Sequence, residues 1–121
     1  DNPKKATNPI VPSCIFTDPE IACVGQDEEK LTRQGKEIEV RKFDFLGSGM
    51  ARLLDETEGF IKIISNKKSG EILGASMIGP RVTELISVLG LGASCGITIS
   101  QLKETIFAHP TLSESIHEAV A

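Results

Sequence analysis

The chain has 121 residues, of which 40% are hydrophobic and 25% charged, and its net charge at pH 7 is −4. This length fits one domain with a core of its own, and the negative charge argues against an electrostatic nucleic-acid binder, which needs a clustered basic face. No apolar run approaches the length of about 20 residues that a membrane span needs, so we expect neither a nucleic-acid nor a membrane partner.

The three cysteines, at positions 14, 23 and 95, are odd in number and form no CxxC motif. A disulfide framework uses paired cysteines, and a structural zinc site uses closely spaced ones. We therefore predict no metal site and a reducing, cytoplasmic location.

The N-terminal stretch 1–9 is polar and contains Pro, Asn and a Lys pair, so we interpret it as a linker or a remnant of cloning before a domain at 10–121. Runs 11–16 and 20–24 are typical of strands, and the Asp18-Pro19 turn between them favours a hairpin. With a two-residue loop, Cys14 would lie opposite Cys23. Two interpretations stay open, a redox pair or two small buried apolar side chains, and the usual burial of free cysteine favours the second.

The run 26–35 predicts a short helix, with Asp27 near its start and Gly35 just past its end. The run 38–45 predicts a strand, although the apolar positions 38 and 40 differ in parity from the apolar positions 43 and 45. A β-bulge near Arg41 and Lys42 would bring both pairs to one face. Residues 47–49 are expected to form a loop.

The clearest hairpin pairs 59–65 with 71–78 through the turn 66–70, which ends in glycine. The run 82–94 then predicts a helix that is apolar almost all round, so it must be buried on more than one side. Gly90 and Gly92 lower its intrinsic stability by about 1 kcal/mol each, which indicates close backbone packing there. Two further helices are predicted at 100–107 and 113–120.

Consecutive strands joined by short turns pair antiparallel, and the sequence therefore predicts the α+β class: a mainly antiparallel sheet of about five strands with helices packed on one side. A nucleotide-binding domain would need GxGxxG after a strand and at the start of a helix. The glycine cluster 90–96 instead ends a helix, and its third glycine comes one residue late. By itself the chain has no evident means of holding a dinucleotide or a flavin.

Residues that carry chemistry concentrate in FAHPTLSE at 107–114. Histidine is suited to proton transfer at neutral pH, and Pro110 fixes the backbone behind His109 and permits a cis bond. Glu114 could accept a hydrogen bond from Nδ1 of His109, the base-plus-orienter arrangement of catalytic triads. The same glutamate completes a capping box with Thr111 as N-cap. The residues alone favour capping for Glu114 and a loop histidine for His109, and His117 is interpreted as a solvated helix residue.

HPTLSE at 109–114 is similar to the C-terminal signature of dihydrolipoamide dehydrogenases, in the pyridine nucleotide-disulfide oxidoreductase family. VPSCIFTDPEIACVG at 11–25 resembles the family's VPSxxxTxPExAxVG segment. The same order continues through TEGFIKI at 57–63, ILGA at 72–75, GP at 79–80 and GAS at 92–94. On this resemblance, 10–121 is identified as the C-terminal dimerisation, or interface, domain of such an enzyme.

The resemblance implies a homodimer whose subunits also carry FAD and NAD domains, so that FAD and NAD belong to the full-length enzyme and none is expected on this chain, which is inactive alone. His109 would exchange a proton with the dihydrolipoamide thiol at the redox disulfide of the partner subunit, and Glu114 would pair with it. The backbone of His109 and Pro110 would approach the partner's flavin. The implied partners are a second copy, the chain's own FAD and NAD domains, and the lipoyl domains of a 2-oxoacid dehydrogenase or glycine cleavage complex.

Some positions depart from the family pattern. Asp18 stands where many members carry His, and Phe16 where many carry Tyr, and neither is tied to chemistry. The family's redox cysteines form a CxxxxC motif in its FAD domain, which none of the three cysteines matches. Glutathione reductases typically carry HPTSSE, and mercuric reductases lack the His and end in a Cys pair, so Leu112 favours the lipoamide enzyme. The alternatives are the same domain of another disulfide reductase, such as glutathione reductase, and a stand-alone dimerisation or protein-docking module, which the apolar helix 82–94 motivates.

Overall fold

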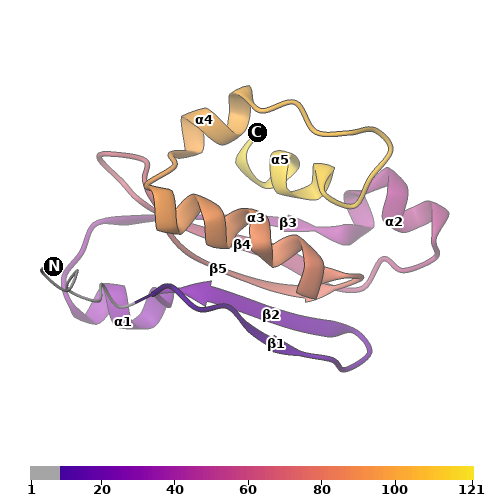
Figure 1. Ribbon diagram of the computed structural model, residues 1–121, viewed down its shortest axis with the longest axis horizontal. Coiled ribbons are helices and arrows are strands. Elements are labelled where there is room, and N and C mark those ends of the chain that lie inside the picture. Colours follow the sequence, from indigo (N-terminus) through magenta and orange to yellow (C-terminus); the bar gives the residue numbers. More distant parts are fainter. Residues whose placement is uncertain (1–8) are drawn as a thin grey trace, which may run out of the picture.

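The computed structural model describes residues 9–121 and shows an antiparallel sheet with its C-terminal helices on one face (Figure 1). The sheet has five strands in the order β1-β2-β5-β4-β3. The strands are β1 (Ser13–Ile15), β2 (Glu20–Gly25), β3 (Ile38–Asp44), β4 (Phe60–Asn66) and β5 (Ile72–Gly79). The predicted α+β class is confirmed. The predicted linker falls almost entirely on residues 1–8, which lie outside the described residues.

The helices follow the strands and turns along the chain. They are α1 (Glu28–Arg33), α2 (Gly49–Leu53), α3 (Val82–Cys95), α4 (Ile99–Glu104) and α5 (Glu114–Val120), with a 3₁₀ turn, η1 (Phe45–Gly47), before α2. Helix α3 packs across β2 and β5, and α5 packs across β3 and β4. Helix α4 contacts α5. The helical layer therefore holds the C-terminal third of the chain over the sheet (Figure 1).

The core lies between the sheet and the helical layer. Alternate strand residues point into it, since successive side chains of a strand face opposite sides. In β4 these are Ile61 and Ile63, both fully buried. Lys62, between them, points to the other face, where its Nζ lies 3.1 Å from Glu28 Oε2 of α1. The helices and the segment before α5 contribute buried aliphatic residues to the same core, namely Val82, Ile86, Leu89, Ile99, Leu102, Leu112, Ile116, Ala119 and Val120.

Helix α3 begins without a local side-chain cap. Arg81 at its N-terminus has a left-handed backbone and makes no side-chain capping bond. Glu20 of β2 supplies the missing acceptor, because its Oε1 accepts hydrogen bonds from Thr83 Oγ1 at 2.6 Å and from Thr83 N at 3.3 Å. A strand side chain distant in sequence thus satisfies one of the free N–H groups that open every helix.

Two glycines mark places where the backbone leaves no room for a side chain. Gly59 has φ of 110°, and a Cβ atom there would lie 1.8 Å from the carbonyl oxygen of Ile78. In α3, a Cβ on Gly92 would lie 3.1 Å from Ile72 Cδ1, so the predicted close packing is confirmed at this position. Gly90 has ordinary room, since its nearest neighbour would be Val24 Cγ2 at 3.6 Å.

The predicted bulge near Arg41 and Lys42 is wrong. Strand β3 pairs with β4 without a break from Ile38 to Asp44, and among the described strands the register shift falls between Ile64 and Ser65 of β4. Apolar residues of both parities fit in β3 without a bulge, because they point to both faces of the sheet. Phe43 faces the core opposite Ile61, whereas Val40 lies opposite Ile64 on the other face.

The predicted pairing of Cys14 with Cys23 is also wrong. Cys23 lies opposite Ser13, and Cys14 lies opposite Ala22. The last pair before the turn is Ile15 with Ile21, so the odd-numbered stretch 16–20 separates the paired positions, whereas the assumed loop had two residues. The one-residue change of register turns the two cysteines to opposite faces. Cys23 is exposed and Cys14 is half-buried, so the expectation of two buried side chains fails for Cys23.

Two helical expectations need correction. The helix predicted at 100–107 spans Ile99–Glu104, because a capping box of Thr98 and Gln101 starts it early and Thr105 ends it with an extended backbone. Helix α2 was not predicted at all. Ser48 caps it by accepting a hydrogen bond from Ala51 N at 3.3 Å, within a stretch interpreted as a loop because of its glycines.

Candidate functional site

His109 lies in the irregular segment 105–113, between α4 and α5. His109 and Pro110 are exposed, and the peptide bond between them is cis, which a proline at position 110 permits. Thr111 Oγ1 donates to the carbonyl oxygen of Ala108 at 2.6 Å and lies 2.8 Å from Ser113 Oγ. These bonds on both sides of the His-Pro peptide fix the course of the segment.

Glu114 contacts two other residues of the HPTLSE motif at once. Its Oε1 lies 2.8 Å from Nδ1 of His109, and its Oε2 accepts a hydrogen bond from Thr111 N at 2.9 Å. The sequence left helix capping and pairing with His109 as alternatives, and the two carboxylate oxygens allow both. The predicted N-cap is wrong, because Ser113 and not Thr111 holds the N-cap position of α5, and the Thr111 hydroxyl binds Ala108 and Ser113.

The charge state of Glu114 fixes the tautomer of His109. The hydrogen bond from Thr111 N, followed by the one from His109, lowers the pKa of Glu114 below its ordinary value of 4.5. Glu114 is therefore an ionised acceptor at neutral pH, and a carboxylate has no proton to donate. Nδ1 of His109 must carry the proton, which leaves Nε2 as the free basic nitrogen. The side chain of His109 is 81% exposed, so Nε2 is open to a reactant that arrives from outside this chain.

A hollow of about 160 Å³ adjoins the His109–Glu114 pair. Residues of η1 and α2 line it on one side, and the HPTLSE segment and the first turn of α5 line it on the other. The lining residues are Gly47, Ser48, Gly49, Met50, His109, Pro110, Thr111, Glu114, Ser115 and Glu118. The start of α2, which sequence reasoning missed, thus belongs to the site. The sequence feature that could have predicted α2 is Ser48, a possible N-cap, shortly before the helix-forming run MARLL at 50–54.

His117 is more constrained than the solvated residue that the sequence predicts. Its Nε2 lies 3.1 Å from the carbonyl oxygen of Lys103, at the end of α4. Its ring lies against Phe107, with 5.9 Å between ring centroids and 55° between planes. No sequence signal pointed to these contacts, because they join residues on separate elements.

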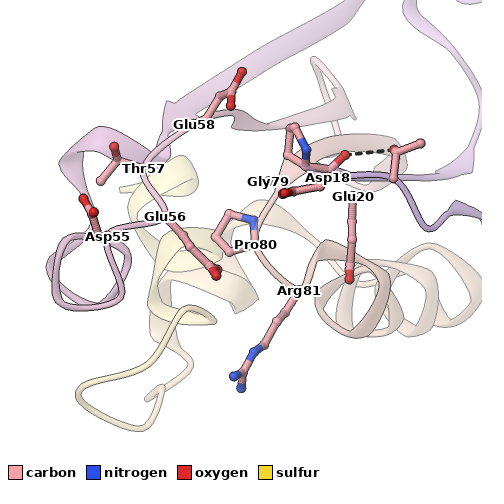
Figure 2. Close-up of a pocket in the computed structure, with 11 residues that line it drawn as sticks. Asp18, Glu20, Asp55, Glu56, Thr57, Glu58, Gly79, Pro80 and Arg81 are labelled. Atoms are coloured by element: carbon pink, nitrogen blue, oxygen red, sulfur yellow. Dashed lines mark hydrogen bonds between the residues drawn. The ribbon is translucent and has the colours of Figure 1, made fainter.

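A second hollow, of about 710 Å³, is strongly acidic and shares no residue with the first. Figure 2 shows its carboxylates gathered near the turn that leads from β5 into α3. Five acidic side chains and one arginine line it, namely Asp18, Glu20, Asp55, Glu56, Glu58 and Arg81. Glu20 has the structural role described above, and the other carboxylates form a solvated acidic surface.

Over the residues that the structure describes, no group of three or more His, Cys, Asp or Glu side chains is arranged to hold a metal ion. None of the helices within 9–121 has the length and apolarity to cross a bilayer.

Known proteins are similar to this chain in sequence. The family described as "Pyridine nucleotide-disulphide oxidoreductase, dimerisation domain" matches residues 11–120. Dihydrolipoyl dehydrogenase from Bacillus subtilis is 41% identical over 118 residues, which cover 98% of this chain and 25% of that protein. Dihydrolipoyl dehydrogenase from Rhizobium etli is 44% identical over 110 residues, which cover 91% of this chain and 23% of that protein. The chain thus spans about a quarter of the length of these curated relatives.

Solved structures share the fold. The HOCl-induced flavoprotein disulfide reductase RclA from Escherichia coli matches with a TM-score of 0.89 and 30% identity, over 93% of this chain and 26% of that chain. LpdA from Mycobacterium tuberculosis matches with a TM-score of 0.86 and 28% identity, over 91% of this chain and 24% of that chain.

Proposed function

Because this chain belongs to the family of pyridine nucleotide-disulphide oxidoreductase dimerisation domains, we propose that it is the C-terminal interface domain of a flavin-dependent dihydrolipoamide:NAD oxidoreductase. In that enzyme it supplies His109 and Glu114 as an acid–base pair to the redox disulfide and FAD site of the partner subunit. The chain is inactive alone, since the flavin, the NAD site and the redox cysteines lie on other domains.

The observation that carries this proposal is the pair itself. The 2.8 Å contact between Glu114 Oε1 and His109 Nδ1 leaves Nε2 of His109 basic and exposed. In the proposed reaction, Nε2 takes the proton from a thiol of dihydrolipoamide as the resulting thiolate attacks one sulfur of the partner subunit's disulfide. A mixed disulfide forms, the original S–S bond breaks, and the other cysteine leaves as a thiolate. Glu114 stabilises the imidazolium that forms and holds the ring in one orientation, as the acidic member of a catalytic triad does.

The exposure of His109 and Pro110 also fits the proposed FAD site, since their backbone is free to approach a flavin held by another subunit. Bound FAD would supply the redox chemistry, and the residues of this chain would supply the proton chemistry. A dimer would bring the two together. Helix α3 supports dimerisation, because its outer face presents Val88 and Leu91, which are 36% and 66% exposed. An exposed apolar stripe of this kind is typical of an interface.

Lipoyl domains of a 2-oxoacid dehydrogenase or glycine cleavage complex are the substrates that this proposal implies, and the cytoplasm is the implied location. The support is the repeated match to dihydrolipoyl dehydrogenases at about 40% identity.

A chimera tests the proposal. In it, this chain replaces the matching C-terminal quarter of the Bacillus subtilis dihydrolipoyl dehydrogenase, and dihydrolipoamide oxidation, FAD content and sedimentation are measured together. His109→Gln should lower turnover by about 10²- to 10⁴-fold, the usual contribution of a positioned base, with FAD content unchanged. Cys23→Ser, on the exposed sheet face, is the matched control and should keep full turnover. The proposal is contradicted if His109→Gln retains turnover, or if the chimera dimerises and holds FAD but does not react.

A further inference from the structure

The segment 105–113 carries His109, and most of the bonds that shape it are local. Thr105 Oγ1 donates to the carbonyl oxygen of Gln101 at 2.8 Å, and Thr111 Oγ1 donates to that of Ala108. Ile106 is 96% exposed and does not anchor the segment to the core. Phe107 and Leu112 attach the segment to the core, so the exposed residues 108–110 between them depend most on local bonds and on the contacts that α5 makes with the segment.

His117 makes two such contacts from the second turn of α5. The last carbonyl groups of a helix lack partners within the helix, and Lys103, in the last turn of α4, is one of these residues. Nε2 of His117 lies 3.1 Å from its carbonyl oxygen. The imidazole also packs on the ring of Phe107, which is half-buried against the core.

Glu114 and His117 are three residues apart and lie on neighbouring positions of one helical face. Through His117, helix α5 contacts Lys103 just before the segment and Phe107 within it. Through Glu114, it holds His109 and Thr111. If the His117 contacts are lost, the end of α4 and Phe107 are no longer fastened to α5, and the His109–Glu114 contact becomes intermittent.

We propose that His117 is a positioning residue for His109, acting by fastening the end of α4 and Phe107 to the helix that carries Glu114. The catalytic part of this proposal rests on the function proposed above. The structural part, that His117 helps to orient His109, rests on the contacts of His117 alone.

The two histidines differ in tautomer, which makes the proposal measurable. A carbonyl oxygen only accepts, so Nε2 of His117 carries a proton, whereas His109 carries its proton on Nδ1. Nitrogen-15 shifts of the imidazole rings in the 121-residue chain report each tautomer separately. In the unchanged chain, His109 should be mainly in the Nδ1–H form.

His117→Ala should lower the ratio of Nδ1–H to Nε2–H forms at His109 severalfold, with the amide spectrum of the sheet unchanged. His117→Gln places an N–H donor near the position of Nε2 and should restore most of the ratio. Glu84→Gln, an exposed carboxylate in the first turn of α3, away from the hollow, should have no effect. An unchanged ratio in folded His117→Ala overturns the proposal. If that variant does not fold, His117→Phe decides, since it keeps the ring packing and loses the donor, and an unchanged ratio there overturns the proposal too.

The chimera separates this inference from the proposed function. His117→Ala should lower kcat/KM by about tenfold through loss of orientation, with FAD content unchanged, and should add no further loss to His109→Gln. If turnover does not depend on His109, the proposed function fails while the tautomer ratio still decides the positioning role. If His109→Gln is impaired but His117→Ala retains full kcat/KM, the positioning role in catalysis is wrong.

Discussion

Replacing Glu20 with alanine should destabilise the chain by about 2 kcal/mol, because this strand residue caps α3. Hydrogen bonds to a charged group contribute about 1.5–3 kcal/mol, and the 2.6 Å contact from Thr83 Oγ1 belongs to this class. The contact from Thr83 N, at 3.3 Å, is long and adds little. Glu20 is half-buried, so water replaces part of the lost bonding and the loss falls in the lower part of that range.

Urea denaturation of the chain measures this cost, with an unchanged m-value as evidence that only stability changed. Glu20→Gln keeps an oxygen acceptor without the charge and should cost about half as much. Asp27→Ala is the matched control, since it removes a local cap from the short, exposed start of α1, where Asp27 accepts from Lys30 N at 2.8 Å. That loss should be about 0.5–1 kcal/mol. If Glu20→Ala costs no more than Asp27→Ala, tertiary capping of α3 is not what Glu20 contributes.

Two further predictions concern Gly59 and Glu114. Gly59→Ala should destabilise the chain by more than about 3 kcal/mol, because its Cβ would meet the Ile78 carbonyl at 1.8 Å. Gly35→Ala, with φ of 71° but open space around it, should cost only about 1 kcal/mol, and equal costs in urea denaturation would rule out the steric explanation. The pKa of Glu114 is lowered in the folded chain from 4.5, so its contribution to stability is complete above that pH and is lost as the pH falls through the lowered value. Thermal melts across the acid range should therefore show a weaker loss of stability for Glu114→Gln than for Glu118→Gln, and identical curves would contradict this linkage.

Local chemistry explains the parts of the fold that the sequence predicted well. The turn 66–70 shapes the hairpin of β4 and β5, because Asn66 Oδ1 accepts from Lys68 N and Ser69 N and Gly70 takes a positive φ. Asp27 marks the start of α1 for the same kind of reason. Such signals act over a few residues and are visible in any sequence.

The errors have a common origin in interactions between distant residues. The parity change in β3 seemed to require a bulge only if all its apolar residues faced one core, and the second face of the sheet was not foreseen. The cysteine register depended on the turn having an odd number of residues between the paired positions, where an even-numbered loop was assumed. Helix α2 escaped notice because Gly47 and Gly49, on either side of Ser48, outweighed the serine cap in a local interpretation.

The sequence by itself determined the class of fold, the family resemblance and the HPTLSE segment, because periodicity, turn residues and ordered motifs are local properties of the chain. It also placed Glu114 within reach of both His109 and Thr111. Only the tertiary structure decided that Glu114 binds both, one through each oxygen, that α2 borders the same site, and that His117 reaches back to Lys103 and Phe107. Those contacts depend on how α4 and α5 pack over the sheet, and a side chain's partners follow from that packing and not from its neighbours in sequence.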